Sequence, residues 1–263
     1  MPRPTHCRMK RRGRRHRRFL LLAGALLVCV PLAGCRTSDT ADSADSAHPS
    51  SSPTATREQQ PRKPPEPAST PSPSASIPLT GSGQFTTALE AMEPVGSGTP
   101  MRYRVQVENS LDVSPSETAR EINAILADKR GWTTSGQAFQ LVASEPAELT
   151  VKLAAPETVD ALCGAAGLDT RGEVNCTVGS TVVVNLKRWL LGSPQFDGSL
   201  HDYRALIINH EVGHRLGHGH EGCSGSAKLA PAMMQQIKGL HGCKANAWPY
   251  DRTGTYISGP AIP

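Results

Sequence analysis

The chain has 263 residues and a formal net charge of +5 at pH 7. Residues 1–34 hold nine Lys or Arg and no acidic residue, so the rest of the chain is net negative. A nucleic-acid-binding protein would carry a basic surplus on its folded part, and we therefore expect no nucleic-acid partner.

The first 34 residues have the pattern of a secretory signal peptide. The basic residues precede an apolar run over Phe19–Leu32, which is short of the about 20 residues that a transmembrane helix needs. The run leads into Leu-Ala-Gly-Cys ending at Cys35, which resembles a bacterial lipobox. We expect Cys35 to carry lipid and to anchor an exported protein on the outer face of the bacterial cell membrane. An ordinary signal peptidase site is the alternative, and Arg17-Arg18 leaves the export route open.

The next segment has a composition that cannot form a core. Residues 36–80 are rich in Ser, Thr, Ala and Pro and hold almost no large apolar side chain, so burial cannot offset their ordering entropy. We place a disordered tether at 35–76 and a folded domain at 77–263, with its core ending near Asp251. A folded pro-domain is the alternative, which the composition disfavours.

The folded part predicts strands first and a long helix late. Alternating side chains predict a strand over Met101–Glu108, and Ser114-Pro115 starts a helix that stops at Gly131. We further predict strands at Ala138–Ala143, Glu148–Leu153 and Thr177–Leu186, a short helix at Pro156–Ala166, and a helix from Ser199 to Gly217. This order indicates an α+β domain.

Four cysteines follow Cys35, namely Cys163, Cys176, Cys223 and Cys243. An even number outside the cytoplasm predicts two disulfides. Sequential pairing, the first with the second and the third with the fourth, is the simplest of the three connectivities. A zinc site built from these cysteines is the alternative, but their spacing contains no C-x-x-C.

The segment from Asn209 to His220 predicts a metal site. His210 and His214 are four residues apart, so both imidazoles project from one face of a helix, where zinc can accept two nitrogens at once. Glu211 stands beside the first ligand, where its carboxylate can reach a metal-bound water, as in zincins. A helix with surface histidines is the alternative.

Gly217 and His220 extend the pattern to H-E-x-x-H-x-x-G-x-x-H. Glycine adopts the positive φ that lets the helix end and the chain turn sharply, so that His220 returns to the metal. We predict His210, His214 and His220 as zinc ligands and Glu211 as general base. His218, which leaves little chain for the turn, is a rival third ligand, and Glu221 is a more distant one.

The extended pattern resembles that of metzincin metallopeptidases. The resemblance implies a metzincin-like zincin domain with a small mixed sheet, a backing helix and a central active-site helix. It also implies a methionine turn beneath the metal, for which Met233 is favoured and Met234 is close behind; two ordinary core methionines are the alternative. A Cys223–Cys243 disulfide would close this loop. Many metzincins carry a Tyr just after this Met, where Gln235 and Gln236 stand here, so a Tyr-assisted mechanism is in doubt.

Residues 209–223, the Met233–Gln236 cluster and Trp248-Pro249-Tyr250 also resemble a secreted actinobacterial family that is metzincin-like and has no assigned substrate. The metzincin resemblance implies a zinc-dependent extracytoplasmic endopeptidase that hydrolyses peptide bonds through a zinc-bound water. We expect a peptide or protein substrate, membrane contact through the lipid only, and a monomer. The alternatives are a zinc amidase acting on cell-wall peptides, a non-catalytic zinc-binding lipoprotein, and an interaction module that has lost activity.

Overall fold

The computed structural model describes residues 76–144 and 146–262. The predicted signal peptide, the predicted lipid site at Cys35 and the predicted tether up to residue 75 lie outside these residues. Within the described part, no helix is long and apolar enough to cross a membrane.

A mixed sheet organises the described residues, with the strand order β2-β4-β3-β5-β7-β6 and with β1 paired to β3. Strands β4, β3, β5 and β7 are parallel, whereas β2, β6 and β1 pair antiparallel with their neighbours. The strands are β1 (Phe85–Thr87), β2 (Val95–Gly96), β3 (Met101–Glu108), β4 (Ala138–Leu141), β5 (Leu149–Ala154), β6 (Cys176–Val178) and β7 (Thr181–Asn185). The edge strand β6 is the one that reaches the candidate site.

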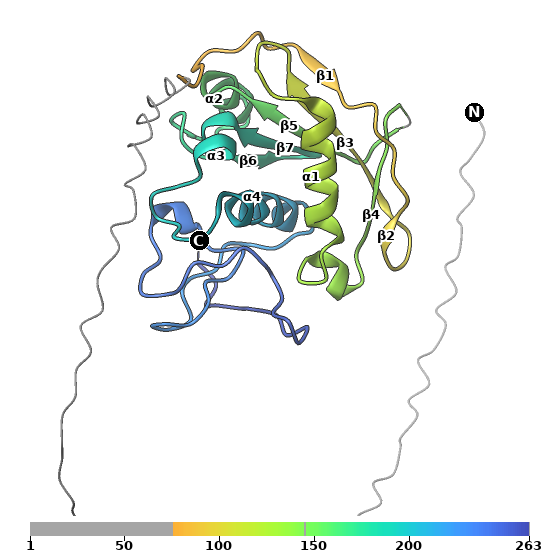
Figure 1. Ribbon diagram of the computed structural model, residues 1–263. Coiled ribbons are helices and arrows are strands. Elements are labelled where there is room, and N and C mark those ends of the chain that lie inside the picture. Colours follow the sequence, from red (N-terminus) through yellow and green to blue (C-terminus); the bar gives the residue numbers. More distant parts are fainter. Residues whose placement is uncertain (1–75, 145, 263) are drawn as a thin grey trace, which may run out of the picture. The chain divides into compact units, whose positions relative to one another are not determined.

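Four helices in the described part accompany the sheet, and together they confirm the predicted α+β class. They are α1 (Pro115–Ala127), α2 (Pro156–Gly164), α3 (Leu186–Leu191) and α4 (Leu200–Arg215). Short 3-10 turns lie at Trp132–Ser135 and Gln236–Lys238. Figure 1 shows α1 crossing the sheet and α4 lying along its lower side.

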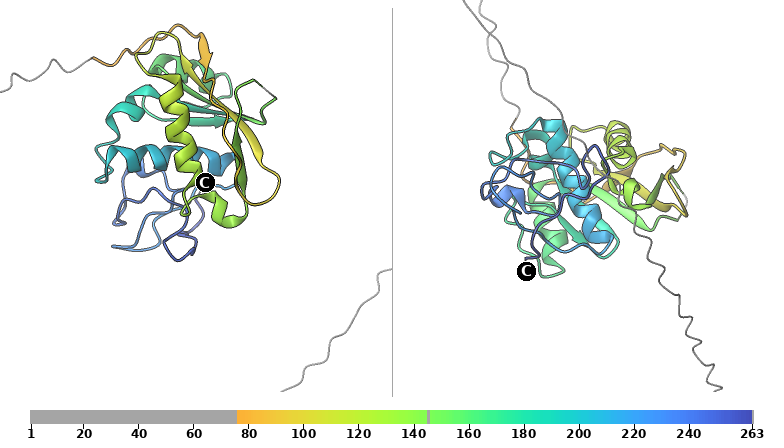
Figure 2. Two further views of the ribbon diagram at one scale, coloured as in Figure 1. Left: turned by 45° about the vertical axis from the view of Figure 1, so that its right-hand side comes forward. Right: turned by 90° about the horizontal axis from the view of Figure 1, so that it is seen from below.

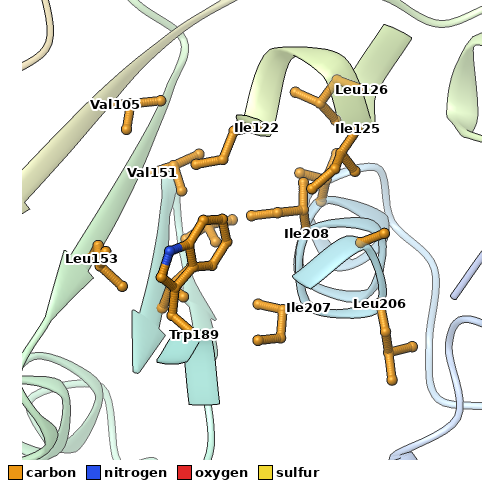
Figure 3. Packing of buried hydrophobic residues seen from close by; sticks show 14 of the residues in the cluster. Val105, Ile122, Ile125, Leu126, Val151, Leu153, Trp189, Leu206, Ile207 and Ile208 are labelled. Atoms are coloured by element: carbon orange, nitrogen blue, oxygen red, sulfur yellow. The ribbon is translucent and has the colours of Figure 1, made fainter. Parts of the chain in front are cut away.

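The main core lies between one face of the sheet and the helices α1 and α4. Val105 and Val151 of the strands meet Ile122 of α1, while Ile208 of α4 packs between α1 and the sheet (Figure 3). Trp189 of α3 closes the same layer beside the strands (Figure 3). Branched and aromatic side chains on the strands thus meet a helical apolar stripe, the pairing that excludes water from both.

The opposite face of the sheet is covered by α2. Val183 points to this side, whereas its neighbours Val182 and Val184 point into the main core, so β7 is buried on both faces. The disulfide Cys163–Cys176 ties α2 to β6, and a second disulfide joins Cys223 to Cys243. Both predicted pairings are confirmed.

The predicted single strand over Thr177–Leu186 is wrong. The segment is a hairpin, because the chain reverses between β6 and β7 at Gly179, whose φ of +56° lies in the region that glycine tolerates. Leu186 belongs to α3, which starts there because the Asn185 side chain accepts the N–H of Lys187 at 2.9 Å. Strands β1 and β2 were not predicted, because two or three residues show no periodicity.

Residues 216–262 form an irregular layer beneath α4, blue in Figures 1 and 2. The layer extends past the predicted core end at Asp251, since Glu221 and Ala261 form an antiparallel bridge. Helix α4 is therefore enclosed, with the sheet and α1 on one side and this layer on the other.

We predict that Ile208→Ala lowers the free energy of unfolding by about 2–5 kcal/mol, because it opens a cavity between α4, α1 and the sheet. Leu191→Ala is the matched control, since Leu191 is 66% exposed and should cost less than about 0.5 kcal/mol. Urea unfolding monitored by tryptophan fluorescence measures both. Equal losses would contradict the packing described for α4.

Candidate metal centre

Two features of the sequence fix the position of α4: a capping residue at its start and an apolar side that packs in the main core. Ser199 caps the helix as predicted: its hydroxyl oxygen accepts the N–H of Asp202 at 3.0 Å, and the hydroxyl donates to the Asp202 carboxylate at 2.8 Å. Ile208 and Val212, four residues apart, are fully buried in the main core. His210 and His214 have the same spacing on another side of the helix, toward the irregular layer.

Two hydrogen bonds lock the rotation of α4 just before its first histidine. The Trp132 indole N–H donates to the carbonyl oxygen of Asn209 at 2.9 Å. The Asn209 side-chain amide donates to the carbonyl oxygen of Ala247 at 3.0 Å. Both side chains are buried, so these bonds hold the helix at a defined angle to the 3-10 turn of Trp132 and to the irregular layer.

The structure brings the three predicted histidines together. One ring nitrogen of each of His210, His214 and His220 lies within 4.8 Å of the other two. Nδ1 of His210 lies 2.8 Å from the carbonyl oxygen of Ala232, and Nδ1 of His214 lies 2.9 Å from that of His218. A carbonyl oxygen can only accept, so each Nδ1 carries the ring proton and leaves Nε2 as a lone-pair donor.

This arrangement fits a tetrahedral cation. The Nε2 atoms of His210 and His214 are 3.2 Å apart, and both present lone pairs, which repel each other unless a positive charge lies between them. Two nitrogens bound to zinc at about 2.0–2.1 Å in tetrahedral geometry would be about 3.3 Å apart. The observed separation therefore suits the donor set of a zinc site.

The protonation of the rings suits metal binding as well. Burial lowers the pKa of His210 to about 3, and it lowers the pKa of His220 below its usual range. Neutral imidazole is the form that binds a metal, so these two rings need no deprotonation at neutral pH.

The two rival ligands are engaged elsewhere. The His218 ring stacks on Trp132 with a centroid distance of 4.4 Å. The Glu221 carboxylate accepts the Tyr256 hydroxyl at 2.8 Å and the Gly259 N–H at 2.7 Å. Among the described residues, neither belongs to a potential metal-ligand cluster, so the predicted choice of His220 is the one that the geometry favours.

Glu211 lies buried beside the first histidine and is held by the edge strand. The Thr177 hydroxyl lies 2.8 Å from Oε2 of Glu211 and 2.9 Å from its backbone carbonyl oxygen. Burial raises the pKa of Glu211 to about 7, partly opposed by the bond from Thr177. Thr177 was not predicted as a site residue, because a lone Thr in a strand pattern gives no signal of a partner 34 residues away.

The two candidate methionines have different surroundings. Met233 is fully buried in the main core, with its sulfur against Gly213 of α4. Met234 belongs to a separate small cluster with Cys223 and Cys243 and lines the cleft described next. The Met beneath the helix that carries the histidines is therefore Met233, the residue favoured by the sequence.

The glutamines after these methionines have different partners. The buried Gln236 donates its amide to the carbonyl oxygens of Pro231 and Asn246, at 3.2 and 2.6 Å. Gln235 accepts a hydrogen bond from Lys238 at 3.0 Å. Gln236 therefore links two segments of the irregular layer, those of Pro231 and Asn246.

A cleft of about 690 Å³ opens at the histidines. Its walls come from residues 168–171 and 173–177, which include the first two residues of the edge strand β6, from α4 and from residues 234–238. Leu206 and Ile207 give it an apolar side, while His210, Glu211 and His214 lie along the same helix. The candidate metal ligands and the carboxylate are thus reachable from one open groove.

The sequence model of a family described as a protein of unknown function, DUF3152, matches residues 71–248. The match covers more than half of the chain, so the chain belongs to this family. Searches of curated proteins and of solved structures found no match.

We predict that Gly213→Ala destabilises the protein, because an added Cβ would overlap the sulfur of Met233 and the indole of Trp132. Gly164→Ala is the matched control: it is also a helical glycine, has open space around its Cβ position, and should gain up to about 1 kcal/mol from helix propensity. Thermal unfolding of both variants measures the difference. A Gly213 variant as stable as the control would show that Met233 does not press on α4.

We predict that the metal-free protein loses stability as the pH rises from about 4.5 to 7, relative to Glu211→Gln. The folded pKa of Glu211, about 7, exceeds its ordinary 4.5, so the folded state binds the proton more tightly and ionisation favours unfolding. The variant should gain on the order of 3 kcal/mol over the wild type across this window. Urea unfolding in the presence of a chelator measures it, and a constant difference would contradict a buried carboxylate.

Proposed function

We propose that this DUF3152 protein is a zinc-dependent endopeptidase that acts outside the cell, with His210, His214 and His220 as metal ligands and Glu211 as general base. The observation that carries the proposal is the pair of Nε2 lone pairs facing each other at 3.2 Å, with a third imidazole and a buried carboxylate beside them. Three neutral imidazoles leave a fourth position open, which is typical of catalytic zinc sites.

Zinc, when bound, acidifies a water molecule and polarises a carbonyl group. The protein supplies the proton transfer: the Glu211 carboxylate takes a proton from the attacking water and returns it to the leaving amine. Burial raises the pKa of Glu211 to about 7 in the metal-free protein, and a bound cation would lower it, so that the charged form could take up the first proton. Thr177 keeps the carboxylate in one orientation by donating to Oε2. A purely structural zinc site would need no such base.

The cleft supports a peptide as the substrate. Strand β6 is at the edge of the sheet, so its outer backbone groups can pair with an extended chain by strand addition. The same cleft holds the three histidines and Glu211, so a chain paired with β6 would lie beside them. We therefore propose extended peptides as substrates.

The relation to metzincins is part of the proposal. The features that support it are the extended histidine motif, the buried Met233 beneath α4, the mixed sheet and the two helices α1 and α4 on one of its faces. The location outside the cell is supported by the two disulfides, which persist in oxidising compartments. Lipid anchoring at Cys35 is proposed from the sequence alone.

We predict that the purified protein holds about one zinc per chain and cleaves a broad peptide library, and that Glu211→Ala keeps the zinc but lowers kcat at least about 100-fold. Glu93→Ala, which removes an exposed carboxylate, is the matched control and should leave both quantities unchanged. Metal analysis and the library digest are run on the same samples.

Two outcomes would contradict the proposal in different ways. Protein that binds no zinc refutes the ligand assignment. Protein that binds zinc but cleaves neither casein nor the library is no endopeptidase; digestion of isolated cell wall then separates a wall amidase from a non-catalytic zinc protein.

A further inference from the structure

The third histidine differs from the other two in how it is held. His210 and His214 lie on a helix, and their rings are oriented by the carbonyl oxygens of Ala232 and His218. Among the described residues, the ring of His220 has no comparable hydrogen-bond acceptor. It also lies outside the regular elements, in a loop where Gly217, Gly219 and Gly222 give the backbone unusual freedom. Something other than its own local structure must position it.

The last described residues of the chain surround this loop, and we call residues 249–262 the C-terminal segment. The N–H of Ile262 donates to the carbonyl oxygen of His220 itself at 3.0 Å, and the N–H of Gly222 donates to that of Pro260 at 2.7 Å. These two bonds flank Glu221 and fix the backbone directly after the third histidine to the last described residues, while the N–H of Glu221 donates to the carbonyl oxygen of Met233 at 3.1 Å.

The side chain of Glu221, next to the third histidine, completes the attachment. Its carboxylate oxygens accept the Tyr256 hydroxyl at 2.8 Å and the Gly259 N–H at 2.7 Å. A carboxylate that accepts two such bonds at once is held far more strongly than by one neutral contact. The two backbones also approach so closely that a Cβ at position 259 would overlap the carbonyl oxygen of Gly222.

The C-terminal segment is anchored independently to the rest of the domain. The N–H of Tyr250 donates to the carbonyl oxygen of Arg130 at 3.0 Å. Within the segment, the N–H of Ile257 donates to the carbonyl oxygen of Pro249 at 2.8 Å, so the stretch that follows is tied to this anchor. The Tyr256 ring lies 6.2 Å from that of Trp132, whose indole also bonds α4. The same tryptophan thus joins the helix of the first two histidines to the segment that holds the third.

We propose that the C-terminal segment is a positioning element for the metal site. Its residues Tyr256 and Gly259 bind Glu221 and thereby hold the neighbouring His220 where it can complete the ligand set. The proposal rests on the proposed zinc site. Groups that orient a ligand typically change metal affinity 10- to 100-fold when they are removed. Without the segment, part of the binding free energy would be lost in ordering the glycine-rich loop.

The test is the zinc affinity of the full chain, measured by competition with a chromogenic chelator. Glu221→Ala removes the acceptors of both bonds, and Tyr256→Phe removes the donor of one of them. Each should weaken zinc binding at least about tenfold. The zinc affinity of the double variant should fall by less than the product of the two single fold-changes, because both substitutions break the same hydrogen bond between residues 221 and 256. Tyr250→Phe is the matched control: its hydroxyl has no hydrogen bond among the described residues, so its zinc affinity should stay within about twofold of the wild type.

The unfolding of the metal-free variants separates positioning from a merely structural role. A structural contact would lower the melting temperature of metal-free protein and leave the zinc dissociation constant unchanged, which would overturn the proposal. If Glu221→Ala does not fold, Gly259→Ala disturbs the same attachment from the other side and takes its place. Wild-type protein that binds zinc and cleaves no peptide would refute the endopeptidase proposal and leave the positioning role intact. Protein that takes up no zinc would overturn both proposals.

Discussion

Two imidazole lone pairs facing each other at 3.2 Å are an unfavourable arrangement for a protein to hold without a cation, and the surrounding structure is built to hold it. The carbonyl oxygens of Ala232 and His218 fix the ring protons on the far side of each histidine, so the lone pairs cannot be relieved by a change of tautomer. The Trp132 indole and the Asn209 amide prevent α4 from turning the pair away. A site of this kind is prepared before any ligand arrives.

Holding the pair requires α4 to be buried on two sides. One side of the helix, with Ile208 and Val212, lies in the main core. On the other side, the absence of a side chain at Gly213 leaves room for Met233 of the irregular layer. This enclosure also buries Glu211, which raises the pKa of the carboxylate. The burial that stabilises the helix thus favours the neutral form of the carboxyl group in the metal-free protein, while Thr177 supplies a hydrogen bond for its charged form.

The irregular layer achieves order without regular elements. The disulfide between Cys223 and Cys243 ties the two ends of the intervening loop together. The buried amide of Gln236 donates to backbone carbonyl oxygens that would be paired within a helix or a strand. The C-terminal segment then closes over the loop of His220. In this layer, side-chain hydrogen bonds and the C-terminal segment provide the order that backbone pairing provides in the sheet. Single substitutions of these side chains should therefore affect the site more than their exposed fractions suggest.

Features that depend on local spacing can be read directly from the order of the residues. The helix of His210 and His214 follows from a capping residue and a four-residue repeat, and β3 follows from simple alternation, since both signals need no distant partner. The α+β class follows from the order of the elements, and the even number of cysteines predicts two disulfides, whose pairing the structure shows.

Contacts between distant segments are visible in the folded structure alone: Thr177 on Glu211, Ala232 on His210, and Tyr256 and Gly259 on Glu221. In the same way, the fold brings His220 beside His210 and His214, whereas the ring of His218 stacks on Trp132. These contacts lack a sequence signal because a carbonyl oxygen, a threonine hydroxyl or a glycine N–H is present almost everywhere in a chain, and only the fold selects the one that is in reach.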